Sequence, residues 1–225
     1  MTEPLISIVV PVLDEAEGLA AFLDHLQAWR PLAELIVVDG GSADASIAIA
    51  TPLVDHVLRA ERGRAAQMNA GAGLGRGRYL LFLHCDTRLS MFAEEFAAEL
   101  DAVPGWGFCR VALSGEDWRL RIVETAMNLR SQLSGVATGD QCLFVERSLW
   151  DQTGGFASIP LMEDIEICKR LRRIRQPHII AAAVVTSSRR WERRGVLATV
   201  LLMWRLRLAF WLGVPPARLV KKYYA

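Results

Sequence analysis

Residues 34–46 read ELIVVDGGSADAS, and this stretch decides the fold class of the chain. It begins with a continuous apolar run, which is typical of a strand buried on both faces of a sheet. The run ends at Asp39, and two glycines follow it. Because glycine has no side chain, Gly40 and Gly41 let a flat ligand approach the backbone closely. We therefore interpret Asp39 as a hydrogen-bond acceptor on the floor of a pocket. Capping of the next helix remains an equal explanation for Ser42 and Asp44.

Strand and helix patterns alternate through the first half of the chain. Expected strands cover 6–13, 34–39, 56–60 and 78–86, and expected helices cover 15–29, 44–50 and 64–75. The second half is less regular, with expected helices at 91–101, 118–133 and 163–174 and expected strands at 108–115 and 179–188. This rhythm predicts an α/β fold with a mostly parallel sheet flanked by helices.

Three acidic residues follow the expected strands of this sheet. Asp14, Asp39 and Asp86 each come at the end of an apolar run. In open α/β sheets, ligands bind beyond the carboxyl ends of the strands. We therefore expect the three carboxylates to converge on one cleft, which would suit hydroxyl groups, base edges and a divalent cation.

Composition narrows the class of protein further. The chain has 225 residues with a net charge of only +1, and its four cysteines are scattered, which favours a reducing, cytoplasmic setting over a zinc or disulfide framework. The N-terminus has no basic segment typical of a signal peptide. Residues 1–168 carry 12 Lys and Arg against 24 Asp and Glu, a net −12, whereas residues 169–225 carry 14 against one acid, a net +13. This asymmetry predicts an anionic partner for the basic end, or else pairing with the acidic body.

An ordered series of motifs resembles a known family. SIVVPVLDEAEGL, ELIVVDGGSADAS, GRAAQMNAGA and LLFLHCDT are followed by GVATGDQCLFVERSLWDQTGGF, MEDIEICKRLRR and the RRW of 189–191. Together they resemble a family 2 glycosyltransferase with the GT-A fold, over roughly residues 5–191. HCDT and GDQ most resemble a bacterial subgroup labelled as arsenosugar-biosynthesis glycosyltransferases. The resemblance implies a nucleoside-diphosphate sugar as donor and a hydroxyl acceptor.

The resemblance also implies which residues bind the nucleotide. They are Pro11, Val12, Asp14, Glu15, Asp39, Gly40, Gly41, Arg64, Gln67 and Asn69. Asp39 would bind the base, and the Arg64 guanidinium would pair with phosphate. For Glu15, a charge that favours a helix N-terminus is an equal alternative. Any of the residues on 64–69 could instead be a solvated helix residue.

Asp86 matches the last acid of the DxD motif, which in the family binds the divalent metal. Hard cations such as Mg²⁺ and Mn²⁺ prefer oxygen ligands, so either metal is expected. This sequence departs from the motif because His84 occupies the first acidic position. His84 cannot supply a second carboxylate, and the alternatives for it are a contact with ribose, phosphate or the donor sugar, or a side chain that only fills space.

The ED motif of inverting members matches Glu163 and Asp164, and the resemblance implies that Asp164 is the general base. The alternative is that both acids only favour the N-terminus of the helix they begin. The residues implied to face the donor sugar and acceptor are His84, Gly139, Asp140, Gln141, Arg190 and Trp191. Trp191 as an ordinary core residue is an equal alternative. Ser187 replaces the glutamine of the QxxRW element, so no processive synthesis is implied.

We expect a GT-A domain over 1–191, with a nucleotide-binding half at about 1–88 and an acceptor half at 89–191. A basic and apolar amphipathic helical tail covers 192–225. Residues 196–225 would lie on an anionic membrane surface or form a homodimer contact, and packing of this helix on the body of the protein is the alternative. Nucleic acid is not expected as a partner. Two rival functions stay open, a nucleotide-binding adaptor at the membrane and a nucleotidyltransferase.

Overall fold

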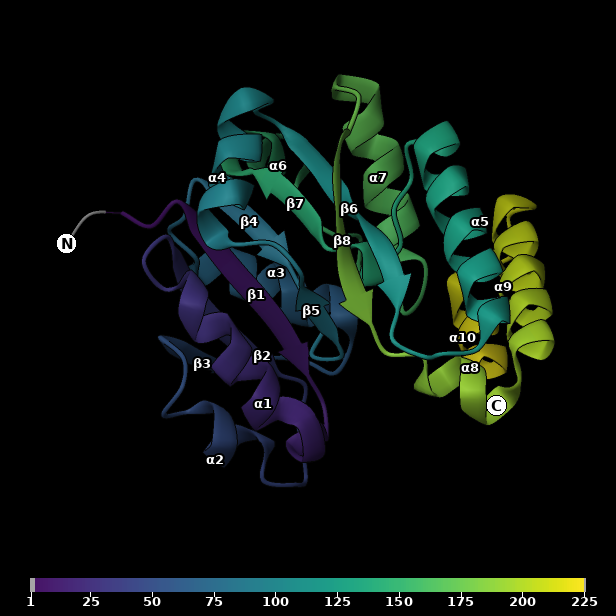
Figure 1. The fold of residues 1–225 in the computed structure, drawn as a ribbon, viewed down its shortest axis with the longest axis horizontal. Coiled ribbons are helices and arrows are strands. Elements are labelled where there is room, and N and C mark those ends of the chain that lie inside the picture. Colours follow the sequence, from purple (N-terminus) through teal and green to yellow (C-terminus); the bar gives the residue numbers. More distant parts are fainter. Residues whose placement is uncertain (1–2, 225) are drawn as a thin grey trace.

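An eight-stranded sheet runs through the chain in the computed structural model, in the order β3-β2-β1-β4-β7-β6-β8-β5 (Figure 1). The structure describes residues 3–224, except for the side chains of residues 183, 190 and 224. The strands are β1 (Ile6–Val12), β2 (Ala33–Asp39), β3 (His56–Arg59), β4 (Tyr79–Phe82), β5 (Thr87–Leu89), β6 (Trp106–Leu113), β7 (Leu143–Glu146) and β8 (His178–Thr186). The helices are α1 (Ala16–Leu26), α2 (Ser46–Ala50), α3 (Arg64–Leu74), α4 (Ala93–Ala102), α5 (Trp118–Ser134), α6 (Arg147–Thr153), α7 (Glu163–Ile174), α8 (Arg189–Arg194), α9 (Val196–Trp211) and α10 (Pro216–Tyr224).

The prediction of a mostly parallel sheet is confirmed. Strands β3, β2, β1 and β4 pair in parallel, and so do β6 and β8. Strand β7 is antiparallel to both of its neighbours, and β5 is antiparallel to β8. Every residue of β1 and β2 is buried, which explains why their sequences are continuous apolar runs rather than alternating ones.

Helices cover both faces of the sheet. Apolar side chains of α1 and α4, including Phe22 and Phe96, pack on one face. Side chains of α3, α6 and α7, including Met68, Trp150 and Leu171, pack on the other. The two faces together form a large apolar core.

One expected strand is wrong at its end. The prediction extends a strand from 78 to Asp86, but β4 ends at Phe82. The chain then leaves the sheet through a turn in which the Thr87 amide donates to the His84 carbonyl at 3.0 Å, and Asp86 immediately precedes β5. Asp14 also lies beyond its strand, two residues after β1, with a left-handed φ of 54°. Of the three acids, only Asp39 is itself the last residue of a strand.

The tail folds into three helices. Helix α9 packs along α5, where Val196 contacts Val123 and Leu120, and the two helices lie side by side at one edge of the molecule (Figure 1). Helix α10 turns back on α9. Among residues 3–224, no helix has both the length and the apolar character needed to span a membrane.

Candidate active site

Two loops at the carboxyl ends of β1 and β2 hold each other in place. The Ser42 hydroxyl accepts a hydrogen bond from the Asp14 amide at 2.9 Å, and the Asp14 carboxylate accepts one from the Ala43 amide at 2.7 Å. Asp44 accepts from the Ala16 amide at 3.0 Å and from the Ser46 amide at 2.9 Å. Ser42 and Asp44 therefore join the two loops, and Asp44 also binds the first amide of α2, as the capping alternative has it.

Asp39 is completely buried where β2 ends. Its carboxylate accepts hydrogen bonds from the Gly41 amide at 3.0 Å and from the Ser42 amide at 3.0 Å. The exposed Arg59 approaches the same carboxylate, with Nε at 3.7 Å from Oδ2. Gly41 has a left-handed φ of 97°, which L side chains rarely adopt. The carboxylate therefore shapes the glycine loop.

Gln67 braces the ends of the two central strands. Its buried amide donates to the Val12 carbonyl and to the Val38 carbonyl, each at 2.8 Å. A Cβ at Gly40 would come within 3.0 Å of this amide, so the glycine is required for close packing. Pro11 and Val12 are buried within β1. The ends of β1 and β2, Gly40 and the Gln67 amide thus form one rigid unit beneath the cleft.

Asn69 and Arg64 connect α3 to the second half of the chain. The Asn69 side chain exchanges two hydrogen bonds with the backbone of Phe156, each at 2.8 Å. Arg64 lies close enough to α7 to lower the pKa of both Glu163 and Asp164 through its charge. This contact joins the expected nucleotide segment to the expected catalytic acids.

A second cluster joins Glu15, Cys85, Asp86 and Arg189. Burial is the main cause that raises the pKa of Glu15, and the Cys85 thiol opposes it by donating a hydrogen bond to the carboxylate. The negative charge of Asp86 raises the pKa of Glu15 further, while the positive charge of Arg189 lowers it. The Ser187 amide donates to the Asp86 carbonyl at 3.0 Å and connects this cluster to the end of β8.

The residues at this cluster fit a metal that takes most of its ligands from elsewhere. Among the described residues, no group of three His, Cys, Asp or Glu side chains could hold an ion. Asp86 is exposed and lies near Glu15, so the protein offers two carboxylates. Mg²⁺ commonly uses one or two carboxylates together with substrate phosphates and water, which matches this donor set.

A pocket between the sheet and α7 collects the expected catalytic residues. His84, Gly139, Glu163 and Asp164 line it together with apolar side chains such as Phe156. A Cβ at Gly139 would lie 2.8 Å from the His84 imidazole, so the ring packs directly on this glycine. His84 and Asp164, far apart in sequence, therefore line one small pocket of about 10 Å³.

Asp164 is held by the backbone at the start of α7. Its carboxylate accepts from the Gly139 amide at 2.8 Å and from the Ile165 amide at 2.7 Å. Burial nevertheless raises its pKa, against the effects of these hydrogen bonds and of the charges of Arg64 and Arg130. For Glu163, burial and the neighbouring Asp164 charge raise the pKa to about 7. Burial thus makes both carboxylates hold a proton more strongly than they would in water.

Gln141 and Arg130 support the turn that carries Gly139. Gln141 is fully buried, and its side-chain oxygen accepts from the Arg130 guanidinium at 3.1 Å and from the Thr138 amide at 3.1 Å. Asp140 contributes charge near Arg130, and burial lowers the pKa of that arginine. Arg130 was missed by the sequence prediction, although it falls seven residues after the buried Val123 on α5 and so lies toward the body.

Trp191 packs in an apolar cluster with Leu113, Leu120 and Val196. This position matches the alternative in which Trp191 is a core residue. Arg190 belongs to α8, but its side chain lies outside the described residues. The charge of its neighbour Arg189 acts on the Glu15 cluster, and the doubled arginine of SSRRW is the sequence signal that could have found it.

Comparison with known proteins agrees with this architecture. A sequence model described as Glycosyl transferase family 2 matches residues 7–143. A PGL/p-HBAD biosynthesis glycosyltransferase of Mycobacterium bovis is 35% identical over 98 residues, 40% of this chain and 38% of that protein. An uncharacterized glycosyltransferase of Haemophilus influenzae is 34% identical over 97 residues, 38% of each chain. The chain thus spans well under half the length of these curated relatives.

Solved structures are similar at the level of the fold. Staphylococcus aureus TarS in complex with UDP superposes with a TM-score of 0.67 at 16% identity, over 81% of this chain and 60% of that one. A mannosyltransferase of Pyrobaculum calidifontis in complex with GDP-Man and Mn²⁺ gives 0.65 at 20% identity, over 93% of this chain and 62% of that one. The chain therefore has the GT-A fold. With the sequence match covering more than half of it, the chain belongs to glycosyl transferase family 2.

Proposed function

We propose that this chain is an inverting glycosyltransferase that moves a sugar from a UDP- or GDP-linked donor to an acceptor hydroxyl. The observation that carries the proposal is the position of Asp164. Its carboxylate is fixed by two backbone amides in a pocket that also contains His84 and Gly139. The solved relatives that bind UDP and GDP-Man support this donor class.

Asp164 acts as the general base. Each carboxylate oxygen accepts one backbone hydrogen bond and keeps a lone pair, so an acceptor hydroxyl can donate its proton to it. As the proton leaves, the acceptor oxygen attacks the anomeric carbon, and the bond from that carbon to the diphosphate oxygen breaks with its electron pair. Attack on the face opposite the leaving group inverts the configuration. The negative charge of Asp164 in turn raises the pKa of the neighbouring Glu163.

The donor lies along the strand ends. Arg64 and Arg189 supply positive charge for the diphosphate, while the loop shaped by Asp39, Gly40 and Gly41 receives the nucleoside. A Mg²⁺ or Mn²⁺ ion held by Asp86, with Glu15 beside it, would offset charge on the departing nucleotide.

Two finer assignments belong to the same proposal. Membership in the arsenosugar subgroup remains a proposal based on HCDT and GDQ, because the relatives above carry other names. The enzyme works in the cytoplasm at the inner face of a membrane through residues 196–225, with a homodimer contact as the alternative. Family membership favours a transferase over a nucleotidyltransferase or a non-catalytic adaptor.

The test replaces Asp164 with asparagine. The amide keeps an acceptor for the Gly139 N–H but cannot take a proton. We expect nucleotide release from UDP- and GDP-sugars to slow by roughly 10²–10⁴-fold, with unchanged UDP or GDP affinity in calorimetry with Mn²⁺. Asp151→Asn, on the exposed side of α6, is the matched control and should leave both measurements unchanged.

Two results would contradict the proposal. A wild-type rate in Asp164→Asn excludes this residue as the base. If the folded wild-type chain binds neither UDP nor GDP, with or without Mn²⁺, the proposed donor class is excluded and the adaptor function is favoured.

A further inference from the structure

Helix α9 exposes a continuous apolar stripe to solvent. The stripe consists of Leu197, Leu201, Trp204, Leu208 and Trp211, with side chains exposed by 57–74%. The alternating spacing of four and three residues places all five on one side of the helix. Soluble chains rarely leave so many large apolar side chains together in water, so the stripe indicates a surface that is covered in use.

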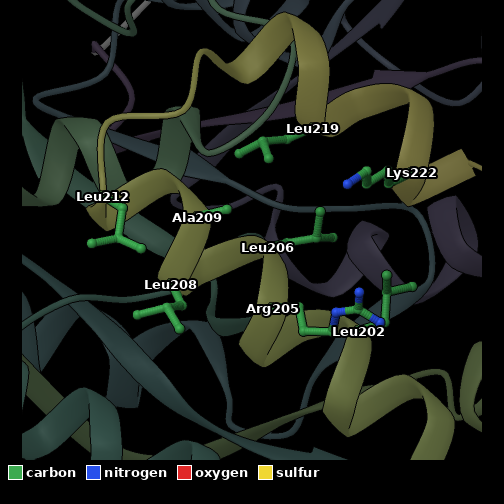
Figure 2. Close-up of a pocket in the computed structure, with 8 residues that line it drawn as sticks. All are labelled: Leu202, Arg205, Leu206, Leu208, Ala209, Leu212, Leu219 and Lys222. Carbon is green, nitrogen blue, oxygen red and sulfur yellow. The ribbon is translucent and has the colours of Figure 1, made fainter.

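A groove between α9 and α10 opens beside this stripe (Figure 2). Its apolar lining residues are Leu202, Leu206, Leu208, Ala209, Leu212 and Leu219. Two cations, Arg205 and Lys222, lie at one end of the groove, and Leu212 lies at the other (Figure 2). The volume of about 410 Å³ falls within the range of small-molecule pockets. Leu208 belongs to both the groove and the stripe, so the two surfaces are continuous.

The charge of this part of the chain has one sign. Residues 193–225 contain seven Lys and Arg and no acid. An apolar groove that ends at two cations matches a ligand with a hydrocarbon chain and an anionic head. We propose that the groove binds one acyl chain of an anionic membrane phospholipid, with its phosphate held by Arg205 and Lys222, while the stripe lies in the membrane interface.

A second copy of the chain suits this surface less well. In a symmetric dimer, the same patch faces itself, so Arg205 and Lys222 of both copies would approach one another. Like charges at an interface are unfavourable, and no acid lies between 193 and 225 to compensate them. Lipid phosphate is oppositely charged, and the exposed Trp204 and Trp211 are of the residue type that anchors proteins at membrane interfaces.

The groove is connected to the candidate active site through packing. Leu206 and Leu219 pack against Leu161, Met162 and Ile165, which flank the two acids of α7. Bound lipid would therefore hold the start of α7 near the bilayer surface. This consequence rests on the proposed function, and it makes an acceptor exposed at that surface accessible to Asp164.

The first experiment measures co-sedimentation of the full chain with vesicles. Phosphatidylcholine vesicles are compared with vesicles that also contain phosphatidylglycerol. We expect binding only to the anionic vesicles, and about 30-fold weaker binding in the R205Q/K222Q double variant, since each basic residue near such a surface contributes a factor of about five. R62Q/R173Q removes two exposed charges elsewhere and should bind like the wild type.

Apolar variants test the stripe separately. W204S should weaken vesicle binding at least tenfold, because tryptophan anchors at the interface. F92S, which removes an equally exposed aromatic residue from the start of α4, should leave binding unchanged. Equal binding of wild type to both vesicle types, or equal loss in F92S and W204S, would overturn the proposal.

The groove itself is tested by filling it. Short-chain phosphatidylglycerol, kept below its micelle concentration, is titrated into the protein in a calorimeter. A209W places a large ring in the groove and should abolish this binding, whereas A126W on the exposed side of α5 should not. Inorganic phosphate should not compete at matched concentration. Full competition by phosphate, or unchanged binding in A209W, would show an anion site without an acyl chain and refute the assignment.

Sedimentation velocity separates the rival occupant. A dimer that W204S dissociates, in a chain that binds no vesicles, would assign the surface to a second copy and overturn the lipid proposal. The proposed function is tested independently, because Asp164→Asn should retain vesicle binding and R205Q/K222Q should retain UDP or GDP binding in solution.

Discussion

Buried carboxylates at two places in this molecule have different surroundings. Asp39 is completely buried and accepts hydrogen bonds from the Gly41 and Ser42 amides, with Arg59 nearby. At the start of α7, Glu163 and Asp164 lie side by side, and burial raises the pKa of both. The Asp39 carboxylate is hydrogen-bonded by its own loop, whereas at the start of α7 the pKa of Glu163 rises to about 7.

The comparison teaches that burial alone does not define the role of an acid. Hydrogen bonds to the charged form stabilise a carboxylate, while desolvation and a like charge destabilise it. At Asp39, the neighbouring amides donate hydrogen bonds to the carboxylate, and the same bonds fix the conformation of the loop. At α7, the positive charge of Arg64 lowers the pKa of both acids, and the charge of Arg130 also lowers the pKa of Asp164. Burial nevertheless raises the pKa of both acids of α7.

The largest expected effect on stability comes from Asp39→Ala. This change leaves the Gly41 and Ser42 amides without their acceptor, and we expect a loss of about 3–4 kcal/mol in the free energy of unfolding. Nucleotide affinity should fall with it, because the loop is no longer shaped. Urea denaturation and UDP or GDP titration measure the two effects. Asp24→Ala, on the exposed face of α1, is the control. A stable variant that still loses nucleotide would make Asp39 a ligand contact rather than a loop anchor.

Glu163→Gln should act in the opposite direction. The folded pKa of Glu163 is about 7, above the ordinary value of 4.5, so the folded state holds a proton that the unfolded state releases. Stability is therefore lost as the pH rises from about 4.5 to about 7. The neutral amide avoids this loss and should stabilise the protein by about 2–3 kcal/mol at alkaline pH, with little change below the unfolded pKa.

Denaturation midpoints at acidic and alkaline pH distinguish this effect from simple repacking. Glu94→Gln, on the exposed side of α4, should change neither midpoint. If Glu163→Gln stabilises the protein equally at both pH values, burial and the Asp164 charge do not raise the pKa of Glu163.

The same comparison explains how much could be predicted from the sequence. The continuous apolar run before Asp39 predicted β2 correctly, and the acids and bases of 163–174 predicted α7 with its bounds. The run LLFLHCD gave no sign that β4 stops at Phe82, because apolar residues continue after the chain leaves the sheet. The end of a strand depends on its partners, which are distant in sequence.

Hydrogen bonds from side chains to backbone atoms were the other feature that could not be predicted from the sequence. Gln67 was expected at the nucleotide, yet its amide bridges the carbonyls of Val12 and Val38, which no local pattern reveals. Cys85 and Arg189 joined the Glu15 cluster without any motif that pairs them. Motif order identified the segments of the candidate site, while the roles within each segment depended on tertiary packing.

Gln67→Ala tests whether that residue is a brace, with an expected cost of about 2 kcal/mol because it removes two buried hydrogen bonds. The Val12 carbonyl keeps its bond from the Gly40 amide at 2.9 Å, which limits the loss. Gln132→Ala, exposed on α5, should cost little. Urea denaturation gives the stability, and calorimetry gives the nucleotide affinity. Lost affinity with unchanged stability would instead make Gln67 a nucleotide contact.

Arg59→Gln should have the smallest effect, although Arg59 is the only cation that forms an ion pair with Asp39 among the described residues. The Arg59 side chain is 73% exposed and its Nε lies 3.7 Å from the carboxylate, so solvent screens the pair and we expect a change below about 0.5 kcal/mol. Denaturation at low and high salt measures it. A salt-sensitive loss several times larger than about 0.5 kcal/mol would mean that Asp39 depends on a charged partner, as the acids of α7 do. The contrast between Asp39 and the acids of α7 would then rest on exposure rather than on backbone hydrogen bonds.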